Sequence, residues 1–425
     1  MSTLRLHLRT SIARWGFVPL TILGVAVLLG RSRFWVGIWP EAGAAAQVSA
    51  FFLSMFSAGT AAWIAAWIEV RGLREQAAAA AVRPFTIELT RFAAALLWLL
   101  APYLVVVVTA FTATAVTPFP PGVGSFFAYV ILGVVMIVLG TAWGWLVGRL
   151  LAPLVAAVCA ALSWFIVASL LQPTDAAPMS GPPWLEIQLS HVGLRLAAVL
   201  LFAVAVCAVP WRSGRPGRFG QRVVVAVVAL AGVLAAHLTT APVSHRAPVA
   251  TPPCVQGVIE YCLWPEHAKY VPMIEAVDRR VAALPVQLPL PERLVDYGLS
   301  GSTRWVDRYT VIALEGSFAP EFDISEGSRW ALARDVARAI LNTVFTECEP
   351  NAQRDPEHRW DQLLGWLEWR LAGGGTPDYR TDAPTELQAA WSVGRRSAAG
   401  LSEQEQAAWV TTVIAEKKEQ FCRAT

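Results

Sequence analysis

Long runs of uncharged apolar residues alternate with short polar segments through the first 240 residues of the chain. About 20 such residues in a helix cross the hydrocarbon core of a bilayer. Backbone groups inside lipid must hydrogen-bond within their own segment, which favours helices for these runs. We therefore predict seven membrane spans, at approximately residues 15–30, 47–68, 92–115, 126–147, 151–171, 191–210 and 223–238.

Arginines gather on one side of these spans, and short loops that carry arginine stay on the cytoplasmic side of a membrane. The inner segments carry Arg5, Arg9, Arg14, Arg71, Arg74, Arg83, Arg91, Arg149, Arg212, Arg215, Arg218 and Arg222. The outer side holds Arg31 and Arg33, with Arg195 near the outer end of the sixth span. This pattern predicts a multi-pass protein of the plasma membrane with a cytoplasmic N-terminus and with everything after residue 240 outside.

The N-terminal segment, residues 4–14, places three arginines between apolar residues. This arrangement is typical of an amphipathic helix on the inner leaflet. A basic start followed by a short apolar run also describes a secretory signal. No small-x-small cleavage pattern follows promptly, and further spans come after, so we expect an uncleaved first helix.

Composition separates the chain into two parts. The 425 residues are 55% hydrophobic and 15% charged, whereas soluble domains have about a quarter charged residues. Residues 1–243 hold 15 arginines, no lysine and 6 acidic residues, and so a net charge of +9. Residues 244–425 hold 19 basic and 25 acidic residues, and so a net charge of −6. The basic residues of the first part lie mostly in short loops, which indicates membrane topology and no nucleic-acid partner.

A proline-rich linker, residues 241–253, leads into the second part, which we expect to be a mostly helical α+β domain outside the membrane. Pro384 opens one of its helices. The last helix begins at a capping box, Ser402 with Glu405 three residues later, and runs to about Cys422. Apolar spacing predicts further helices at residues 265–284, 328–345 and 357–371, and short strands at 286–296 and 304–314.

Four of the six cysteines lie in the second part: Cys254, Cys262, Cys348 and Cys422. In a compartment that permits oxidation, four cysteines indicate two disulfides, with three possible pairings. We favour Cys254–Cys262, which would close a hairpin around Gly257, and Cys348–Cys422, which would tie the last helix back.

No phosphate-binding loop is present. The only lysines are Lys269, Lys417 and Lys418, and none follows a glycine-rich turn after a strand. The chain therefore does not use ATP by that route. Carriers driven by ion gradients place carboxylates or paired charges deep in their spans, and the predicted spans have almost none. If the chain transports, we expect its energy to come from a partner.

Motifs of hydrolytic enzymes are also missing from the sequence. Neither an H-E-x-x-H nor a G-x-S-x-G pattern occurs. The second part has three histidines, His245, His267 and His358. His267 and His358 each follow Pro–Glu at or near a helix start, where the glutamate carboxylate is favourable beside the helix dipole. We therefore interpret these segments as helix caps rather than as metal sites. We expect no enzyme activity, no metal and no cofactor in this chain.

Three features of the spans allow two interpretations each. Arg195 either extends its side chain to the interface or contacts an anionic substrate. His237 is either an interfacial residue or a proton relay. Gly140, Gly144 and Gly148 repeat at four-residue spacing, which lets helix backbones approach closely. That stripe packs either inside this chain's own bundle or against a partner permease half.

The loop between the second and third predicted spans carries a charged pattern. It contains Glu69, Val70, Arg71, Gly72, Leu73, Arg74, Glu75, Arg83 and Pro84. With the amphipathic N-terminal segment, six spans and the proline-rich outer connector at residues 172–190, residues 1–211 resemble the ABC-2 type permeases of ABC exporters. The resemblance implies a six-helix bundle and makes this loop the coupling helix that docks on a separate ATPase subunit.

The chain departs from that family by adding residues 212–240, a cytoplasmic loop with a seventh span, and residues 254–425, the outer domain. The resemblance implies an exporter permease that pairs with a second copy or a paralogue and is powered by ATP hydrolysis in its partner. The alternative is a membrane-anchored receptor or scaffold whose working part is the outer domain.

Overall fold

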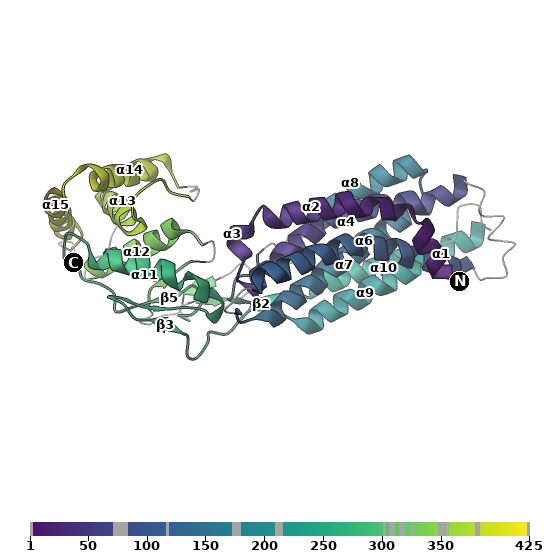
Figure 1. The fold of residues 1–425 in the computed structure, drawn as a ribbon, viewed down its shortest axis with the longest axis horizontal. Coiled ribbons are helices and arrows are strands. Elements are labelled where there is room, and N and C mark those ends of the chain that lie inside the picture. Colours follow the sequence, from purple (N-terminus) through teal and green to yellow (C-terminus); the bar gives the residue numbers. More distant parts are fainter. Residues whose placement is uncertain are drawn as a thin grey trace. The chain divides into compact units, whose positions relative to one another are not determined.

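The structure is a computed structural model that describes residues 3–70, 84–115, 119–171, 180–208, 216–300, 303–305, 311–313, 319–324, 327–346, 355, 357–378 and 383–422. The chain divides into two compact units, Met1–His245 and Arg246–Thr425. The first unit is built almost entirely of helices, and the second combines helices with short strands (Figure 1).

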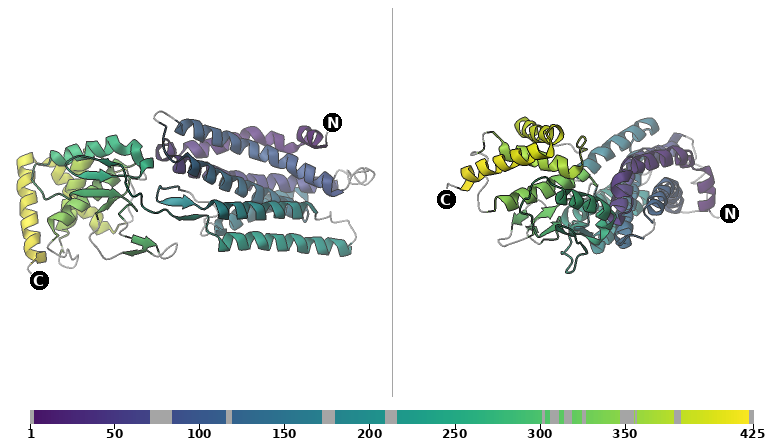
Figure 2. Two further views of the ribbon diagram at one scale, coloured as in Figure 1. Left: turned by 90° about the horizontal axis from the view of Figure 1, so that it is seen from below. Right: turned by 60° about the vertical axis from the view of Figure 1, so that its left-hand side comes forward.

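The long helices of the first unit run side by side in the views of Figures 1 and 2. Helices form here because an apolar run can satisfy its backbone polar groups within one segment only as a helix. Their bounds are α1 Thr3–Thr10, η1 Ile12–Gly16, α2 Phe17–Leu29, α3 Ser32–Trp35, α4 Trp39–Val70, α6 Pro84–Thr114, α7 Val123–Gly148, α8 Pro153–Leu171, α9 Leu189–Ala208 and α10 Pro216–Thr239.

Six helical stretches of the described chain are long and apolar enough to cross a membrane. They are Ile12–Leu29, Trp39–Trp67, Phe85–Thr114, Val123–Gly148, Pro153–Leu170 and Leu189–Ala208. These helices agree with the predicted class, a helical polytopic membrane protein. Helix α10 has 24 residues but a shorter apolar run, Val224–Thr239, so a seventh span stays a prediction.

The predicted starts of the second and third spans are wrong, because both helices include charged residues that the predictions place in loops. Helix α4 begins at Trp39, well before the predicted residue 47, and includes Glu41 in its first turn. A carboxylate is favourable there, beside the positive end of the helix dipole. Helix α6 begins at Pro84 rather than residue 92, since proline suits a first helical position. Glu88 and Arg91 therefore lie inside α6.

Helix α7 packs against α4 along the glycine stripe. A Cβ added to Gly140, Gly144 or Gly148 would lie 2.7, 2.0 or 2.4 Å from a backbone carbonyl oxygen of α4. For Gly144 that oxygen belongs to Ala58. These distances are far inside van der Waals contact, so only glycine fits. The structure places the stripe inside this chain's own bundle, as in the first of the two expected arrangements.

Buried serines of α4 bind neighbouring helices. Ser54 Oγ accepts a hydrogen bond from Trp164 Nε1 of α8 at 2.8 Å. Ser49 Oγ donates to the carbonyl oxygen of Gly24 in α2 at 2.9 Å. In a lipid environment these groups have no water to bind, so their bonds fix how α2 and α8 dock on α4.

The second unit contains a four-stranded sheet in the order β3-β4-β5-β8. Strand β3 is antiparallel to β4, while β4, β5 and β8 are parallel. Parallel neighbours need a crossover, and a helix, α11, supplies it between β4 and β5. The bounds are β3 Cys254–Val255, β4 Glu260–Cys262, η3 Pro265–Tyr270, α11 Val271–Ala282, β5 Arg293–Asp296 and β8 Glu321–Phe322.

The strand predictions need correction. The strand expected at 286–296 is shortened to β5, because Pro289 and Pro291 have no amide hydrogen to donate. The strand expected at 304–314 is a pair of antiparallel strands, β6 Thr303–Trp305 and β7 Val311–Ala313.

The expected linker 241–253 is also partly structured. Its residues Val243–His245 form β2, which pairs antiparallel with β1, Leu185–Ile187, inside the first unit. The first unit therefore extends to His245 and includes α10.

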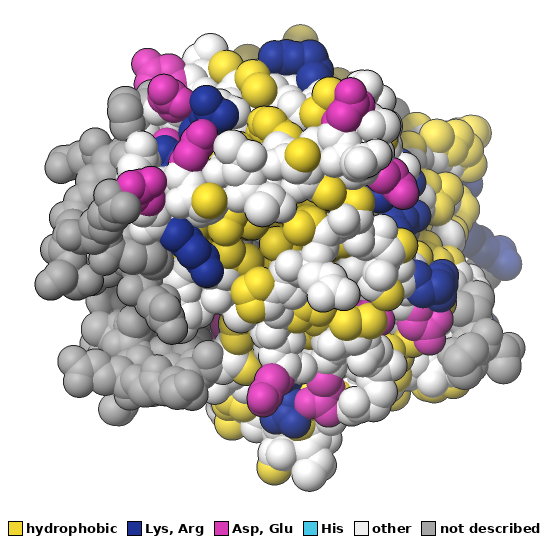
Figure 3. All heavy atoms as spheres, turned by 90° about the vertical axis from the view of Figure 1, so that its left-hand side faces the viewer, with side chains coloured by type: hydrophobic (Ala, Val, Ile, Leu, Met, Phe, Trp, Pro, Cys, Tyr) yellow, Lys and Arg dark blue, Asp and Glu magenta, His cyan; other side chains and the backbone are white. Residues whose placement is uncertain are grey.

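Four helices complete the second unit: α12 Arg329–Val344, α13 Arg359–Ala372, α14 Thr385–Gly400 and α15 Glu403–Cys422. The predicted capping box is confirmed, because the Ser402 amide donates to Glu405 Oε2 at 2.9 Å and the Glu405 amide donates to Ser402 Oγ. The face of this unit shown in Figure 3 has charged side chains of both signs around a central area of hydrophobic side chains.

A buried ion pair joins α15 to the start of α13. Lys417 Nζ lies 2.7 Å from Asp355 Oδ1, and both side chains are almost fully buried. Asp355 also accepts the backbone amides of Arg359 and Trp360, at 3.0 and 2.9 Å. Burial raises the pKa of Asp355, but the hydrogen bonds from Lys417 and the two amides outweigh it, so the pKa lies below its ordinary value.

The glycine stripe generates a first prediction. Gly144→Ala should push α7 away from α4, since the new Cβ has no space, and destabilise the protein by about 1–3 kcal/mol. The matched control is Gly124→Ala in the same helix, where a Cβ would meet nothing within 4 Å. Thermal unfolding in one detergent should show a lower midpoint for Gly144→Ala only; equal midpoints would contradict the packing described.

A second prediction concerns Asp355. Because its folded pKa is depressed, the carboxylate contributes stability that is present above an unfolded pKa of about 4 and is lost as the pH falls through the folded value. Asp355→Asn should therefore lower the thermal midpoint at pH 7, with a difference that shrinks below about pH 4.

The control for this prediction is Glu357→Gln, an exposed carboxylate beside the same helix start. It should change the midpoint little at either pH. A pH-independent difference between the wild type and Asp355→Asn would show that the charge of Asp355 is not what stabilises the junction.

Candidate coupling site

The predicted coupling loop joins α4 to α6. Glu69 is the second-to-last residue of α4 and Pro84 is the first residue of α6. Arg71, Gly72, Leu73, Arg74, Glu75 and Arg83 lie outside the described residues. What the structure does show is how the described ends of these helices are held.

A cluster of three charged residues lies at this end of the bundle. Glu88, in the second turn of α6, binds two arginines at once. Its Oε1 lies 2.9 Å from Arg91 Nη1, one turn further along α6, and its Oε2 pairs with Arg149 Nη2 at the end of α7. Arg91 Nη2 also donates to the carbonyl oxygen of Ile64 in α4 at 3.1 Å. The cluster therefore ties α4, α6 and α7 together.

The cluster is buried against aromatic rings. The side chains of Arg149, Glu88 and Arg91 are 1%, 7% and 13% exposed. The guanidinium carbons of Arg91 and Arg149 lie 5.7 and 6.0 Å from the centre of the Trp145 ring, within the range of cation–π attraction. Phe92 packs edge-on against the same tryptophan.

Helix α1 reaches the same place. Trp98 Nε1 of α6 donates to the carbonyl oxygen of Leu8 at 2.9 Å, which fixes α1 beside α6. Burial lowers the pKa of His7, and the positive charge of Arg91 lowers it further, against the opposing effect of Glu88. The charges of the cluster therefore affect the pKa of His7.

This arrangement links the positions of three helices. A buried carboxylate with two cations holds its partners strongly, because removing one partner leaves an uncompensated charge away from water. Arg149 also lies at the C-terminus of α7, where a cation is favourable. A displacement of the start of α6 therefore acts on α4 and α7 as well.

The sequence pattern alone does not reveal this cluster. The predicted third span begins at residue 92, which leaves Glu88 and Arg91 in the preceding loop, and Arg149 indicates only the cytoplasmic side. A signal was present in the sequence, since a carboxylate and an arginine at helical i,i+3 spacing face one side of a helix. Arg149, at the end of α7, is the third member of the cluster.

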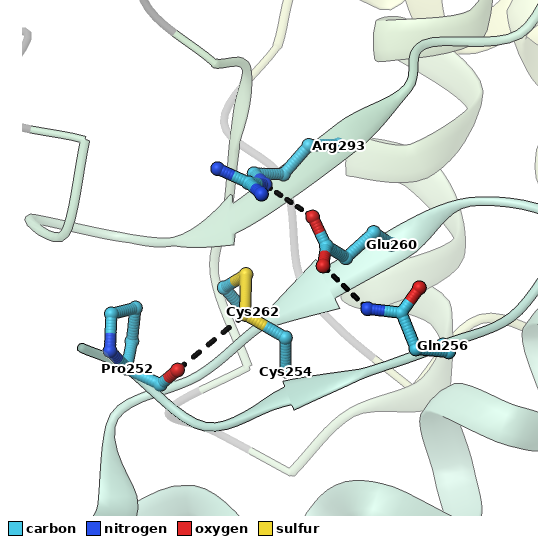
Figure 4. The surroundings of a disulfide bond; sticks show 6 residues. All are labelled: Pro252, Cys254, Gln256, Glu260, Cys262 and Arg293. Atoms are coloured by element: carbon cyan, nitrogen blue, oxygen red, sulfur yellow. Dashed lines mark hydrogen bonds and ion pairs between the residues drawn. A yellow bond between two sulfur atoms is a disulfide. The ribbon is translucent and has the colours of Figure 1, made fainter.

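The predicted disulfide Cys254–Cys262 is present. It joins β3 to β4 across directly opposed positions, with a Cα–Cα distance of 4.0 Å (Figure 4). Cys348 lies outside the described residues, so its pairing with Cys422 of α15 stays a prediction. Cys159 of α8 and Cys207 of α9 are free.

The histidines of the second unit have structural partners. His267 Nδ1 lies 2.5 Å from Asp296 Oδ2, and both side chains are fully buried. Burial raises the pKa of Asp296 above its ordinary value, although the neighbouring His267 opposes this shift. His358 Nδ1 lies 3.4 Å from Asp361 Oδ2. The start of α13 is capped by Asp355 rather than by the neighbours of His358, which corrects the capping assignment.

Among the described residues, one group of metal-ligating side chains is close enough to share an ion: Cys254, Glu260 and Cys262. Its two cysteines form the disulfide, so their sulfurs are not thiolate ligands. Glu260 instead pairs with Arg293 of β5 and accepts from Gln256, as Figure 4 shows. The disulfide cross-links β3 to β4, and the ion pair of Glu260 joins β4 to β5.

The structure shows how the two polar residues of the spans are packed. Arg195 is fully buried in the protein and donates to the carbonyl oxygens of His237 and Thr240. His237 is also buried, with Nδ1 2.9 Å from the carbonyl oxygen of Val233. A position of either residue at the membrane interface stays a prediction.

Comparisons with known proteins give no relative. No protein-family model, curated protein or solved structure matches this chain.

The buried cluster generates a third prediction. Glu88→Ala should destabilise the protein by about 3–5 kcal/mol, because it leaves Arg149 buried without its carboxylate. Arg149→Met should destabilise the protein less, because Arg91 still pairs with Glu88, and the double variant should lose less than the sum of the two. Thermal unfolding in one detergent measures the cycle.

The control for the cycle is Glu186→Ala, an exposed carboxylate of the first unit that should change the midpoint little. Strictly additive losses for Glu88→Ala and Arg149→Met would mean that the two residues are not coupled.

Proposed function

We propose that this chain is the permease subunit of an ABC exporter of the ABC-2 type, in which a separate ATPase subunit hydrolyses ATP. The observation that carries the proposal is the Glu88–Arg91–Arg149 cluster, which ties three helices together next to the ends of the charged loop 71–83. The six membrane-length helices and the amphipathic α1 beside α6 also support it.

In this proposal the ATPase presses on the loop 71–83 from the cytoplasm. The force enters α4 and α6, which are the helices on either side of the loop. The ion pairs of Glu88 pass it to α7, and α2 and α8 follow because they dock on α4. Movement of these helices would open a path between two permease halves, formed by two copies of this chain or by a paralogue.

The second unit would lie outside the membrane, where it gates the exit or recruits a substrate or partner. Its disulfide supports that location, because disulfides persist in oxidising compartments. The charge pattern of the spans supports the same orientation.

A second candidate function is a membrane-anchored receptor or scaffold. The observation that favours it is the independent compactness of Arg246–Thr425, which has its own sheet, helices and disulfide. In that case the helices of the first unit serve as an anchor and need no ATPase.

The experiment that tests the proposal is co-purification of the full-length chain with the ATPase encoded beside its gene. A variant with Arg71→Glu and Arg74→Glu should lose association and at least about tenfold of the ATPase stimulation, because like charges at an interface are repulsive. The matched control carries Arg31→Glu and Arg33→Glu, the same charge change on the opposite side of the membrane.

Loss in the loop variant with full stimulation in the control supports the coupling role. Unchanged association and stimulation in the loop variant would contradict it. A wild-type chain that neither binds nor stimulates the ATPase would favour the receptor or scaffold.

A further inference from the structure

The outer end of α10 is held by a buried arginine from α9. Arg195 Nη2 donates to the carbonyl oxygen of His237 at 3.0 Å and also to that of Thr240. Carbonyls at the end of a helix lack partners within the helix, and a cation is favourable at that end. Arg195 therefore caps α10 from the neighbouring helix.

The chain that follows α10 is bound along its whole length to α9 and the segment before it. His191 Nδ1 lies 2.7 Å from the carbonyl oxygen of Ala241. The Gln188 amide donates to the carbonyl oxygen of Pro242 at 2.8 Å, and Gln188 Nε2 donates to Ser244 Oγ at 2.7 Å.

Pairing of β1 with β2 completes these contacts. Ile187 lies opposite Val243, and Leu185 lies opposite His245. Each residue from Thr240 to His245 thus has a partner on α9 or just before it. The segment Thr240–His245, called the strap below, is therefore bound to the first unit, although most of it falls in the predicted proline-rich linker 241–253.

The strap leads directly into the second unit. His245 is the last residue of the first unit, and Arg246 is the first residue of the second. Within the second unit, Arg246 Nη1 lies 2.7 Å from Glu266 Oε1, and its guanidinium lies over the ring of Trp264. Arg246, which follows His245 directly in the chain, is thus held by residues of the second unit.

We propose that Arg195 is a positioning residue that fastens the chain entering the second unit to the outer end of α9, so that the attachment point of the second unit moves with α9. This assigns the buried arginine a role other than substrate binding. It depends on neither ATP nor a partner, and therefore stands apart from the proposed transport function.

Hydrogen exchange on the full-length chain in lipid nanodiscs tests the proposal. Arg195→Met should raise amide exchange across residues 237–245 by about tenfold or more, because charged hydrogen bonds to two carbonyls are lost. Arg195→Lys should raise it less, since an ammonium still donates. Exchange in residues 259–263 of the second unit should not change.

A second variant covers the case in which Arg195→Met loosens the bundle more widely. Ile187→Cys with Val243→Cys, at opposed positions of β1 and β2, should form a disulfide on oxidation. In the Arg195→Met background this cross-link should restore protection of residues 237–245.

Equal exchange at residues 237–245 in the wild type and Arg195→Met would overturn the proposal. So would a loss of protection that spreads into residues 259–263 and is not restored by the cross-link, because Arg195 would then stabilise the fold in general. Restored protection under oxidation supports the assigned role.

Discussion

Helix α4 can approach α7 closely because α7 presents only backbone at three positions of their contact, Gly140, Gly144 and Gly148. At Gly144 the carbonyl oxygen of Ala58 occupies the space that any Cβ would need. Lipid offers no hydrophobic driving force between helices, so close backbone packing and interhelical hydrogen bonds must hold them. The docking of α2 and α8 through Ser49 and Ser54 follows from this central pair.

The same constraint governs the charges of the first unit. An ionised group away from water is costly unless it is paired, and the buried charges Glu88, Arg149 and Arg195 each have a partner. Glu88 holds two arginines near one end, and Arg195 binds helix-end carbonyls near the other. These contacts join helices to one another near both ends of the bundle.

Much of the fold follows from the sequence, because the apolar runs identify the long helices and the cysteine spacing identifies one disulfide. The errors share a physical cause. A charged residue does not always lie outside a membrane-length helix. Glu41, Glu88 and Arg91 lie inside helices, where the helix dipole or ion pairs stabilise them. Similarly, prolines were used as the mark of a linker, although residues 243–245 form a strand with β1.

The candidate site could be predicted only in part. The loop 71–83 stands out from its charges, but the partner of Glu88 lies on a different helix, and one sequence without contacts does not specify which ends meet. The carbonyl partners of Arg195 could not be predicted either, because they depend on how α10 packs on α9. Long-range pairing of this kind becomes visible only when the helices are placed.

The central claim is that the loop between α4 and α6 faces the cytoplasm, where a motor can reach it. Labelling with a membrane-impermeant maleimide tests this directly, on chains carrying Ala78→Cys in the loop or Ala177→Cys in the outer connector, each compared with the unmodified chain. The account predicts that Ala177→Cys is labelled in intact cells and Ala78→Cys only in inverted vesicles. Labelling of Ala78→Cys in intact cells would contradict it.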